Sequence, residues 1–203
     1  MVFMKLAAII SGGKDSWYAY YKMLKRGYEI ATIITFIPKR KDSYMFHFPL
    51  AKNVSIQVKN LKITHYVFEV SGEKEKEVKE MEEYLKKIVK IEEIRGLISG
   101  AIKSNYQKNR IDNICKELKI KSFTPLWRND EKILLNEIID SGFEFLVTQI
   151  CAEGIEKWKN KIINKINLNE FIRDLEKARC NIGGEGGEYE TFVIRSPLFT
   201  IFN

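Results

Sequence analysis

The chain has 203 residues and a net charge of +7, and 45% of its residues are hydrophobic. That hydrophobic share is sufficient to bury a core, which excludes extensive disorder, and no apolar run has the length of a membrane span. The basic charge permits an acidic partner or RNA but identifies neither. The N-terminus lacks the layout of a signal peptide, so we expect a cytoplasmic protein that does not enter a membrane.

Cysteine and histidine usage argues against two classes of site. The 3 cysteines lie far apart and form no C-x-x-C pattern, which disfavours a disulfide framework and a zinc site. The 2 histidines, His47 and His65, are too few for a histidine-rich metal centre. We therefore look for chemistry that needs neither residue.

The first predicted strand, residues 6–10, leads through a glycine loop into a predicted helix at 17–25. The loop reads Ser11-Gly12-Gly13-Lys14-Asp15-Ser16. Such a junction presents backbone N–H groups and the positive end of a helix dipole, which favour a bound anion. The glycines let the backbone approach phosphate oxygens, while Lys14 adds positive charge. Asp15 would repel a bare phosphate, so we expect it to hold a metal ion or to cap the loop.

The loop is not a Walker A motif, which needs four residues between Gly and Gly-Lys-Ser/Thr. It resembles the pyrophosphate loop, S-G-G-x-D-S, of the ATP pyrophosphatase families, which cleave ATP to AMP and pyrophosphate. The alternative is an ordinary glycine turn. A full match directly after a buried-type strand favours nucleotide binding.

Strands and helices alternate through the rest of the first half. Apolar, β-branched runs predict further strands at 30–37, 65–70, 95–100 and 121–127. Helical patterns lie between them, at 49–60, 73–90 and 101–118. This order predicts an α/β fold with a doubly wound parallel sheet and right-handed crossovers. We place a domain boundary after Trp127, which gives domains of residues 1–127 and 128–203.

The second domain is predicted to be a smaller α+β unit. It has a helix at 131–140, an apolar strand at 143–150, two helices at 154–166 and 168–179, and a short terminal strand, and we expect Trp158 in its core. Its most unusual segment is Gly183-Gly184-Glu185-Gly186-Gly187-Glu188-Tyr189-Glu190-Thr191-Phe192. So many glycines are entropically costly for a simple connection. The glutamates suit a metal, an ammonium ion or a cationic substrate, and an acidic surface loop is the alternative. On a strand, Glu188 and Glu190 would share one face.

Together these segments resemble the diphthine–ammonia ligase family, also described as N-type ATP pyrophosphatases. The resemblance covers nearly the whole chain and rests on residues 11–16, 43–47, 100–102 with Ser104, 106–108 with Arg110, 125–127 and 184–192. It implies that residues 1–127 form an ATP pyrophosphatase domain with the HUP fold of adenine nucleotide alpha-hydrolases. Residues 128–203 would then bind the substrate.

The implied reaction is the last step of diphthamide synthesis. ATP would adenylate the carboxylate of diphthine on translation elongation factor 2, and ammonia would displace AMP. The implied cofactors are ATP and Mg²⁺, the implied partners are elongation factor 2 and ammonium, and a homodimer is allowed. An enzyme of this kind mainly positions its reactants and stabilises phosphate charge, which needs no Ser or Cys nucleophile.

The resemblance also implies roles for individual residues, which we treat as hypotheses. Phosphate binding is assigned to the loop, that is to Ser11, Gly12, Gly13, Lys14, Asp15 and Ser16, with Mg²⁺ on Asp15. Catalytic roles are assigned to Lys14, Asp15 and Glu188. Glu185, Glu188 and Glu190 would bind ammonium or the trimethylammonium group of diphthine, with Tyr189 as a cation–π partner. Substrate contacts are assigned to Tyr44, His47, Tyr106, Gln107, Arg110, Glu185, Tyr189 and Glu190.

Two other functions use the same loop. A tRNA-modifying enzyme with ATP pyrophosphatase chemistry is weakly favoured by the basic charge, but the chain has no paired cysteines for sulfur transfer and no extra RNA-binding module. A nucleotide sensor without catalysis is disfavoured by the intact Lys14-Asp15 pair.

Overall fold

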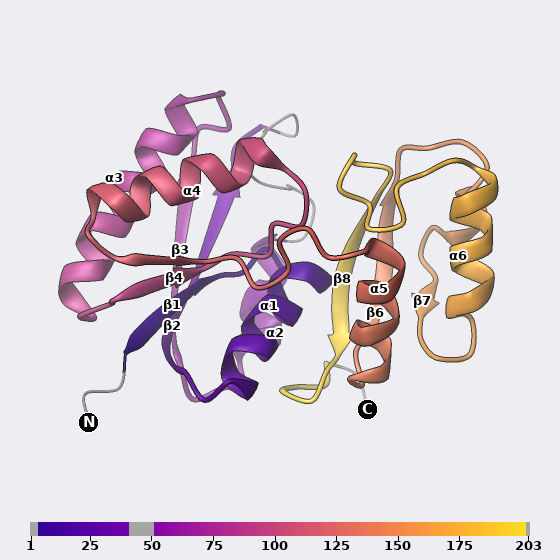
Figure 1. The fold of residues 1–203 in the computed structure, drawn as a ribbon, viewed down its shortest axis with the longest axis horizontal. Helices are drawn as coiled ribbons and strands as arrows, with labels where there is room; N and C mark the ends of the chain where they lie inside the picture. The colour runs from indigo at the N-terminus through magenta and orange to yellow at the C-terminus, as the bar shows by residue number, and fades with distance from the viewer. Residues whose placement is uncertain (1–3, 41–50, 202–203) are drawn as a thin grey trace.

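A five-stranded parallel sheet occupies the first half of the chain in this computed structural model, which describes residues 4–40 and 51–201 (Figure 1). Its spatial order is β3-β2-β1-β4-β5. The strands are β1 (Lys5–Ile9), β2 (Glu29–Pro38), β3 (Thr64–Val70), β4 (Gly96–Ile98) and β5 (Lys121–Phe123). All of these pairings are parallel. The strand order reverses between β1 and β4, and open α/β sheets bind ligands at such a switch point.

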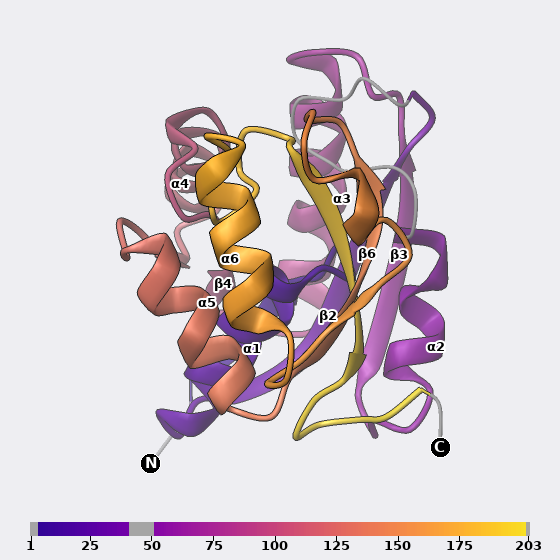
Figure 2. The same cartoon turned by 90° about the vertical axis from the view of Figure 1, so that its right-hand side faces the viewer.

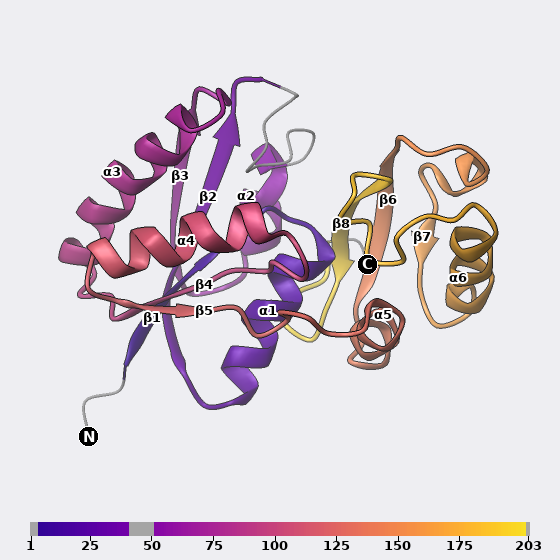
Figure 3. The same ribbon diagram turned by 45° about the horizontal axis from the view of Figure 1, so that its top comes forward.

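Helices cover both faces of this sheet, so the predicted doubly wound α/β fold is confirmed (Figure 3). Successive strand residues point to opposite faces. Leu6 and Ala8 of β1 pack with α1 (Lys14–Lys25) and α2 (Val54–Val58), whereas Ala7 packs with α3 (Lys76–Ile91) and α4 (Asn105–Glu117). A short 3₁₀ turn, Ala51–Asn53, precedes α2.

A second, antiparallel sheet forms the C-terminal part in the order β7-β6-β8 (Figure 1), and Figure 2 views the molecule from this end. Its strands are β6 (Glu144–Ile150), β7 (Ile162–Ile163) and β8 (Tyr189–Arg195), and its helices are α5 (Glu131–Asp140) and α6 (Leu168–Lys177). The core cluster that surrounds α1 continues into this part through Phe143, Phe145 and Phe171. Helix α1 therefore packs between the two sheets, as Figure 1 shows.

The expected helix at 154–166 is wrong. A single 3₁₀ turn, Glu156–Trp158, is followed by strand β7. Asn160 has a φ of +60°, which a helix cannot contain, and its N–H donates to the carbonyl oxygen of Val147 in β6 (2.8 Å). Pairing with β6 thus prevails over helical propensity. The expected core position of Trp158 is confirmed, because its side chain is 5% exposed and its ring packs on Phe171.

Several other boundaries differ from prediction, and three of them lie near the site or the domain boundary. Strand β5 ends at Phe123 instead of Trp127, because Thr124 to Trp127 form a turn closed by a bond from Trp127 N to Thr124 O (3.0 Å). Helix α4 begins at Asn105, where Ser104 caps it. Helix α1 begins at Lys14, within the glycine loop. The first part of the helix predicted at 49–60 and the segment 43–47 lie outside the described residues.

No described helix combines the length and the apolar character that crossing a lipid bilayer requires.

Candidate active site

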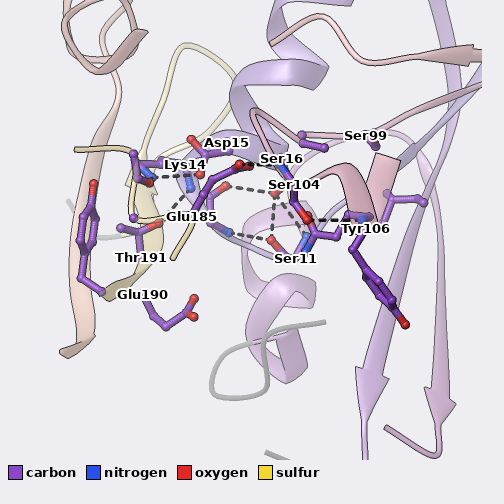
Figure 4. Close-up of a pocket in the computed structure, with 18 of the residues that line it drawn as sticks. Ser11, Lys14, Asp15, Ser16, Ser99, Ser104, Tyr106, Glu185, Glu190 and Thr191 are labelled. Carbon is purple, nitrogen blue, oxygen red and sulfur yellow. Dashed lines mark hydrogen bonds and ion pairs between the residues drawn. The ribbon is translucent and has the colours of Figure 1, made fainter. Parts of the chain in front are cut away.

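A pocket of about 350 Å³ lies at the carboxyl ends of β1 and β4, where the strand order reverses. Three segments supply most of its lining, namely the glycine loop after β1, the turn after β4 with the start of α4, and the glycine-rich segment before and in β8 (Figure 4). Thr148 of β6 adds a further lining residue. The pocket therefore unites the two motifs that the sequence singled out, although they are separated by most of the chain.

The glycine loop is closed by its own serines. Ser16 Oγ accepts hydrogen bonds from Ser11 N (3.3 Å) and Ser11 Oγ (3.2 Å), and it donates to Gly13 O (3.0 Å). Gly12 has a φ of +93°, which L side chains rarely adopt. A Cβ on Gly13 would lie 3.3 Å from both the carbonyl oxygen and the Oγ1 of Thr191, so a side chain there would crowd β8. These constraints explain both glycines.

The N-terminus of helix α1 faces the pocket and is capped by a side chain of β8. Gly13, at the N-cap position, has no side chain to cap the helix, and Thr191 Oγ1 accepts the hydrogen bond from Lys14 N instead (3.2 Å). The N-terminal N–H groups and helix dipole form an environment that suits phosphate. The backbone N–H groups of the loop and of the first turn of α1 are therefore suited to bind the phosphates of ATP.

Lys14 is buried, with 3% of its surface exposed, and is engaged on three sides. Its Nζ donates to Gly183 O (2.7 Å) and to Asp15 Oδ2 (2.9 Å), and it lies 5.1 Å from the centre of the Tyr189 ring. Burial alone would lower the pKa of Lys14, but the nearby Asp15 carboxylate and Tyr189 hold that pKa above its ordinary value. The ammonium group is therefore charged and aligned between the loop and the glycine-rich segment.

Tyr189 forms the wall behind this ammonium. Burial raises the pKa of its phenol well above the usual range, so the group is neutral. Its hydroxyl donates to Ile182 O (2.5 Å), and its ring packs against Phe171. The Tyr189 ring therefore has a fixed orientation, and the cation that lies beside it in this structure is Lys14, whereas its contact with a substrate cation stays a prediction.

Glu185 joins the glycine-rich segment to the first sheet. Its carboxylate accepts hydrogen bonds from the backbone N–H groups of Ile102 (2.6 Å), Lys103 and Ser104 (2.9 Å) at the start of α4. A negative charge is favourable at this end of a helix. The carboxylate lies at the pocket wall in Figure 4, directed toward α4.

The other predicted substrate residues divide into two groups. Tyr106, Gln107 and Glu190 line the pocket. Glu188 and Arg110 are not among its lining residues. Tyr44 and His47 lie outside the described residues.

The contacts of Glu188 and Arg110 explain their positions. Glu188 lies in a bend before β8, so it does not share a strand face with Glu190 as expected, and its Oε1 accepts from Asn181 N (3.1 Å) and Nδ2 (2.6 Å). Arg110 forms an ion pair with Glu75, and its guanidinium stacks 3.6 Å from the centre of the Tyr106 ring. The Arg110 contacts fix Tyr106 beside the pocket.

Sequence reasoning assigned no role to several polar residues of the pocket, among them Ser99, Thr148 and Thr191. Ser99 directly follows β4, is 4% exposed, and its Oγ has no hydrogen-bond partner within the described part of the chain. Its position at the carboxyl end of a buried strand was the available signal. Thr191 caps α1 across the pocket, which only the tertiary structure reveals.

The carboxylates that line the pocket are the groups to consider for Mg²⁺. Within residues 4–40 and 51–201, no three His, Cys, Asp or Glu side chains cluster as a metal site. Asp15 is the carboxylate that the loop itself supplies. Because Mg²⁺ commonly uses one or two carboxylates together with phosphates and waters, Asp15 fits such a role.

Comparisons with known proteins show the family of the chain. The family model for the diphthamide synthase N-terminal domain matches residues 4–122, and that for the diphthamide synthase C-terminal domain matches residues 129–201. Proteins named diphthine–ammonia ligase from Mus musculus and Homo sapiens are 31% and 30% identical, and each match covers 97% of this chain and 80% of the relative. The relative of that name from Saccharomyces cerevisiae is 26% identical, with 97% of this chain and 33% of the relative covered. The chain therefore belongs to the diphthamide synthase family of ATP-dependent ligases.

Proposed function

We propose that this ligase converts diphthine on translation elongation factor 2 to diphthamide, with ATP and ammonia as co-substrates. One observation carries the proposal, namely the meeting of the pyrophosphate loop, residues 11–16, with the glycine-rich segment, residues 183–191, in a single pocket. The names of the relatives supply the substrate and the nitrogen donor. We further propose that the chain works in the cytoplasm.

The chemistry has two steps. An oxygen of the diphthine carboxylate attacks the α-phosphorus of ATP, the bond to the bridging oxygen breaks, and pyrophosphate leaves. Ammonia then attacks the carbonyl carbon of the acyl-adenylate, AMP leaves, and one proton is released. The protein contributes position and charge stabilisation, which are the main sources of catalysis in such transfers.

The loop side of the pocket would hold the phosphates. The N–H groups at the start of α1, the hydroxyls of Ser11 and Ser16, and the ammonium of Lys14 supply donors and positive charge. Lys14 Nζ would exchange its bond to Gly183 O for one to a phosphate oxygen. We assign Mg²⁺ to Asp15 in this arrangement, where the metal would neutralise phosphate charge.

The glycine-rich side would hold the modified histidine and ammonium. Glu190 and Tyr189 line the pocket and offer a carboxylate and an aromatic face, which suit a trimethylammonium group or ammonium. Glu185 and Glu188 would add negative charge at its margin. Contacts from Tyr44, His47, Gln107 and Arg110 stay predictions. The boundary after Trp127 also stays a proposal, supported by the separate sheets on either side of it.

A mass measurement tests the proposal. Elongation factor 2 carrying diphthine is incubated with the purified protein, ATP, Mg²⁺ and ammonium. We expect a mass shift from acid to amide, with AMP and pyrophosphate released in equal amounts. An unchanged mass, with ATP cleavage that depends on tRNA and disappears after RNase treatment, would contradict the proposal and favour a tRNA-modifying enzyme.

Glu188→Gln tests the charge of the glycine-rich segment. We expect the fold to survive, because the amide oxygen of Gln can still accept from Asn181, while amidation is lost with the negative charge. The measurement is the same mass assay, together with the thermal unfolding midpoint. Glu83→Gln, on the exposed face of α3, is the control and should stay active. Normal amidation by Glu188→Gln would remove this residue from the mechanism.

A further inference from the structure

A buried glutamine in α2 lies behind the pyrophosphate loop. The Gln57 side chain is fully buried, and its Nε2 donates to Gly12 O (3.0 Å) and to Val193 O (2.7 Å). Its Oε1 accepts from Trp17 Nε1 (2.8 Å). Two acceptors and one donor surround the amide, so only one orientation of this group satisfies all three neighbours.

These contacts fix the peptide between Gly12 and Gly13. The carbonyl oxygen of Gly12 accepts from Gln57 and also from Val193 N (2.9 Å). In a planar trans peptide the C=O and N–H bonds point in opposite directions. Holding the Gly12 oxygen toward β8 therefore turns the Gly13 N–H to the other side, where it donates to Ser11 Oγ (3.4 Å) in the pocket wall.

We propose that Gln57 is a positioning residue for nucleotide binding, an inference that rests on the proposed function. Gln57 is not among the residues that line the pocket, so it acts through the Gly12 carbonyl by aiming the Gly13 N–H at the ATP phosphates. Without the amide, this glycine peptide keeps only the hydrogen bond from Val193 N to the Gly12 oxygen and is held less firmly. An N–H that must be reoriented upon binding costs affinity.

The same amide also links the pyrophosphate loop to strand β8, the two elements that form opposite sides of the site. Val193 belongs to β8, the strand that carries Tyr189, Glu190 and Thr191 into the pocket. The Gln57 amide therefore hydrogen-bonds both to Gly12 in the phosphate-binding loop and to Val193 in the strand that carries the substrate-side residues. A change at Gln57 is therefore expected to lower kcat as well as ATP affinity, since both reactants lose alignment.

The experiment compares Gln57→Met with Leu85→Ala. Methionine has a similar length but no amide, whereas Leu85 lies in the hydrophobic cluster between the sheet and α3, on the opposite face. Both variants lose stability. ATP affinity is titrated without protein substrate at a temperature where each variant is folded, and the unfolding midpoint is recorded with and without ATP.

We expect Gln57→Met to bind ATP about tenfold more weakly, as the loss of one oriented hydrogen bond implies, and to show a smaller ATP-induced rise in its midpoint than the wild type at the same ATP concentration. Leu85→Ala should bind ATP within about twofold of the wild type, because Leu85 shares no contact with the pocket and substitutions at distant positions rarely affect one another. Gln57→Asn is a second variant that keeps an amide in the cavity but is too short to reach all three partners, and it should weaken binding in the same direction.

Equal ATP affinity in Gln57→Met and Leu85→Ala would overturn the inference and leave Gln57 with a purely structural role. Failure of the proposed function would look different, because the mass assay would then show no amidation of diphthine while ATP still raised the wild-type midpoint. A wild type whose midpoint ATP does not raise would refute the nucleotide site and this inference together.

Discussion

Gly100→Ala is expected to lower the ligase rate by about 10²-fold or more, the cost of misplacing reacting groups by about 1 Å. A Cβ at this position would lie 2.7 Å from Ser16 N and 2.8 Å from the carbonyl carbon of Asp15. Both contacts are with the backbone of the first turn of α1, which cannot move aside as a flexible side chain can. The turn after β4 and the phosphate-binding helix would have to separate, and the pocket lies between them.

Steady-state kinetics with ATP as the varied substrate check this expectation, together with the thermal midpoint. Gly27→Ala is the matched control, because a Cβ there has nothing within 4 Å, and its φ of +82° adds only a backbone cost of about 1–2 kcal/mol. Gly27→Ala should have a lower thermal unfolding midpoint than the wild type and should keep the wild-type activity. Wild-type kinetics in Gly100→Ala would show that the turn can retreat without moving Ser16.

The parallel sheet could be predicted because its signals are local. Strands such as β2 are apolar on both faces and end at a proline, and helix α5 was predicted with its bounds unchanged, Glu131–Asp140, since Asp130 caps it and Gly142 follows it. Strand β7 could not be predicted in this way. It has only two residues, Ile162 and Ile163, and it forms because β6 offers a free edge, which is a property of the tertiary structure.

In the candidate site, too, the features with local sequence signals could be predicted and those that depend on the tertiary structure could not. The loop at 11–16 and the glycine-rich segment are contiguous motifs, so their residue types alone indicated chemistry, and the structure places both in one pocket. Gln57 carried no such signal. Its two backbone acceptors lie 45 and 136 positions away in sequence, and nothing near a glutamine in a short helix indicates them. Glu188 was selected by composition, but a bend before β8 directs it toward Asn181.

Lys14→Met is expected to reduce kcat by about 10²–10³-fold, the usual loss when one charged donor to a developing transition-state charge is removed. Methionine fills a similar volume beside Tyr189 but cannot donate to a phosphate oxygen. The variant should be less stable than the wild type, because the Asp15 carboxylate and the Gly183 oxygen both lose a charged donor. The Asp15 side chain is 26% exposed and can turn to water, so the fold should survive and the activity should fall by far more than the stability.

The pH dependence distinguishes Lys14 from a lysine that acts as a base. Because its folded pKa lies above the ordinary value of about 10.4, its stabilising charge is fully present below that pH and is lost only as pH rises through the folded value. The wild-type rate should thus show no titration of Lys14 between about pH 6 and 9.

Lys25→Met, in the last turn of the same helix, is the control for Lys14→Met and should retain the wild-type rate. A Lys14→Met variant that amidates normally would exclude Lys14 from phosphate binding, and the backbone N–H groups of α1 would then have to supply the stabilisation.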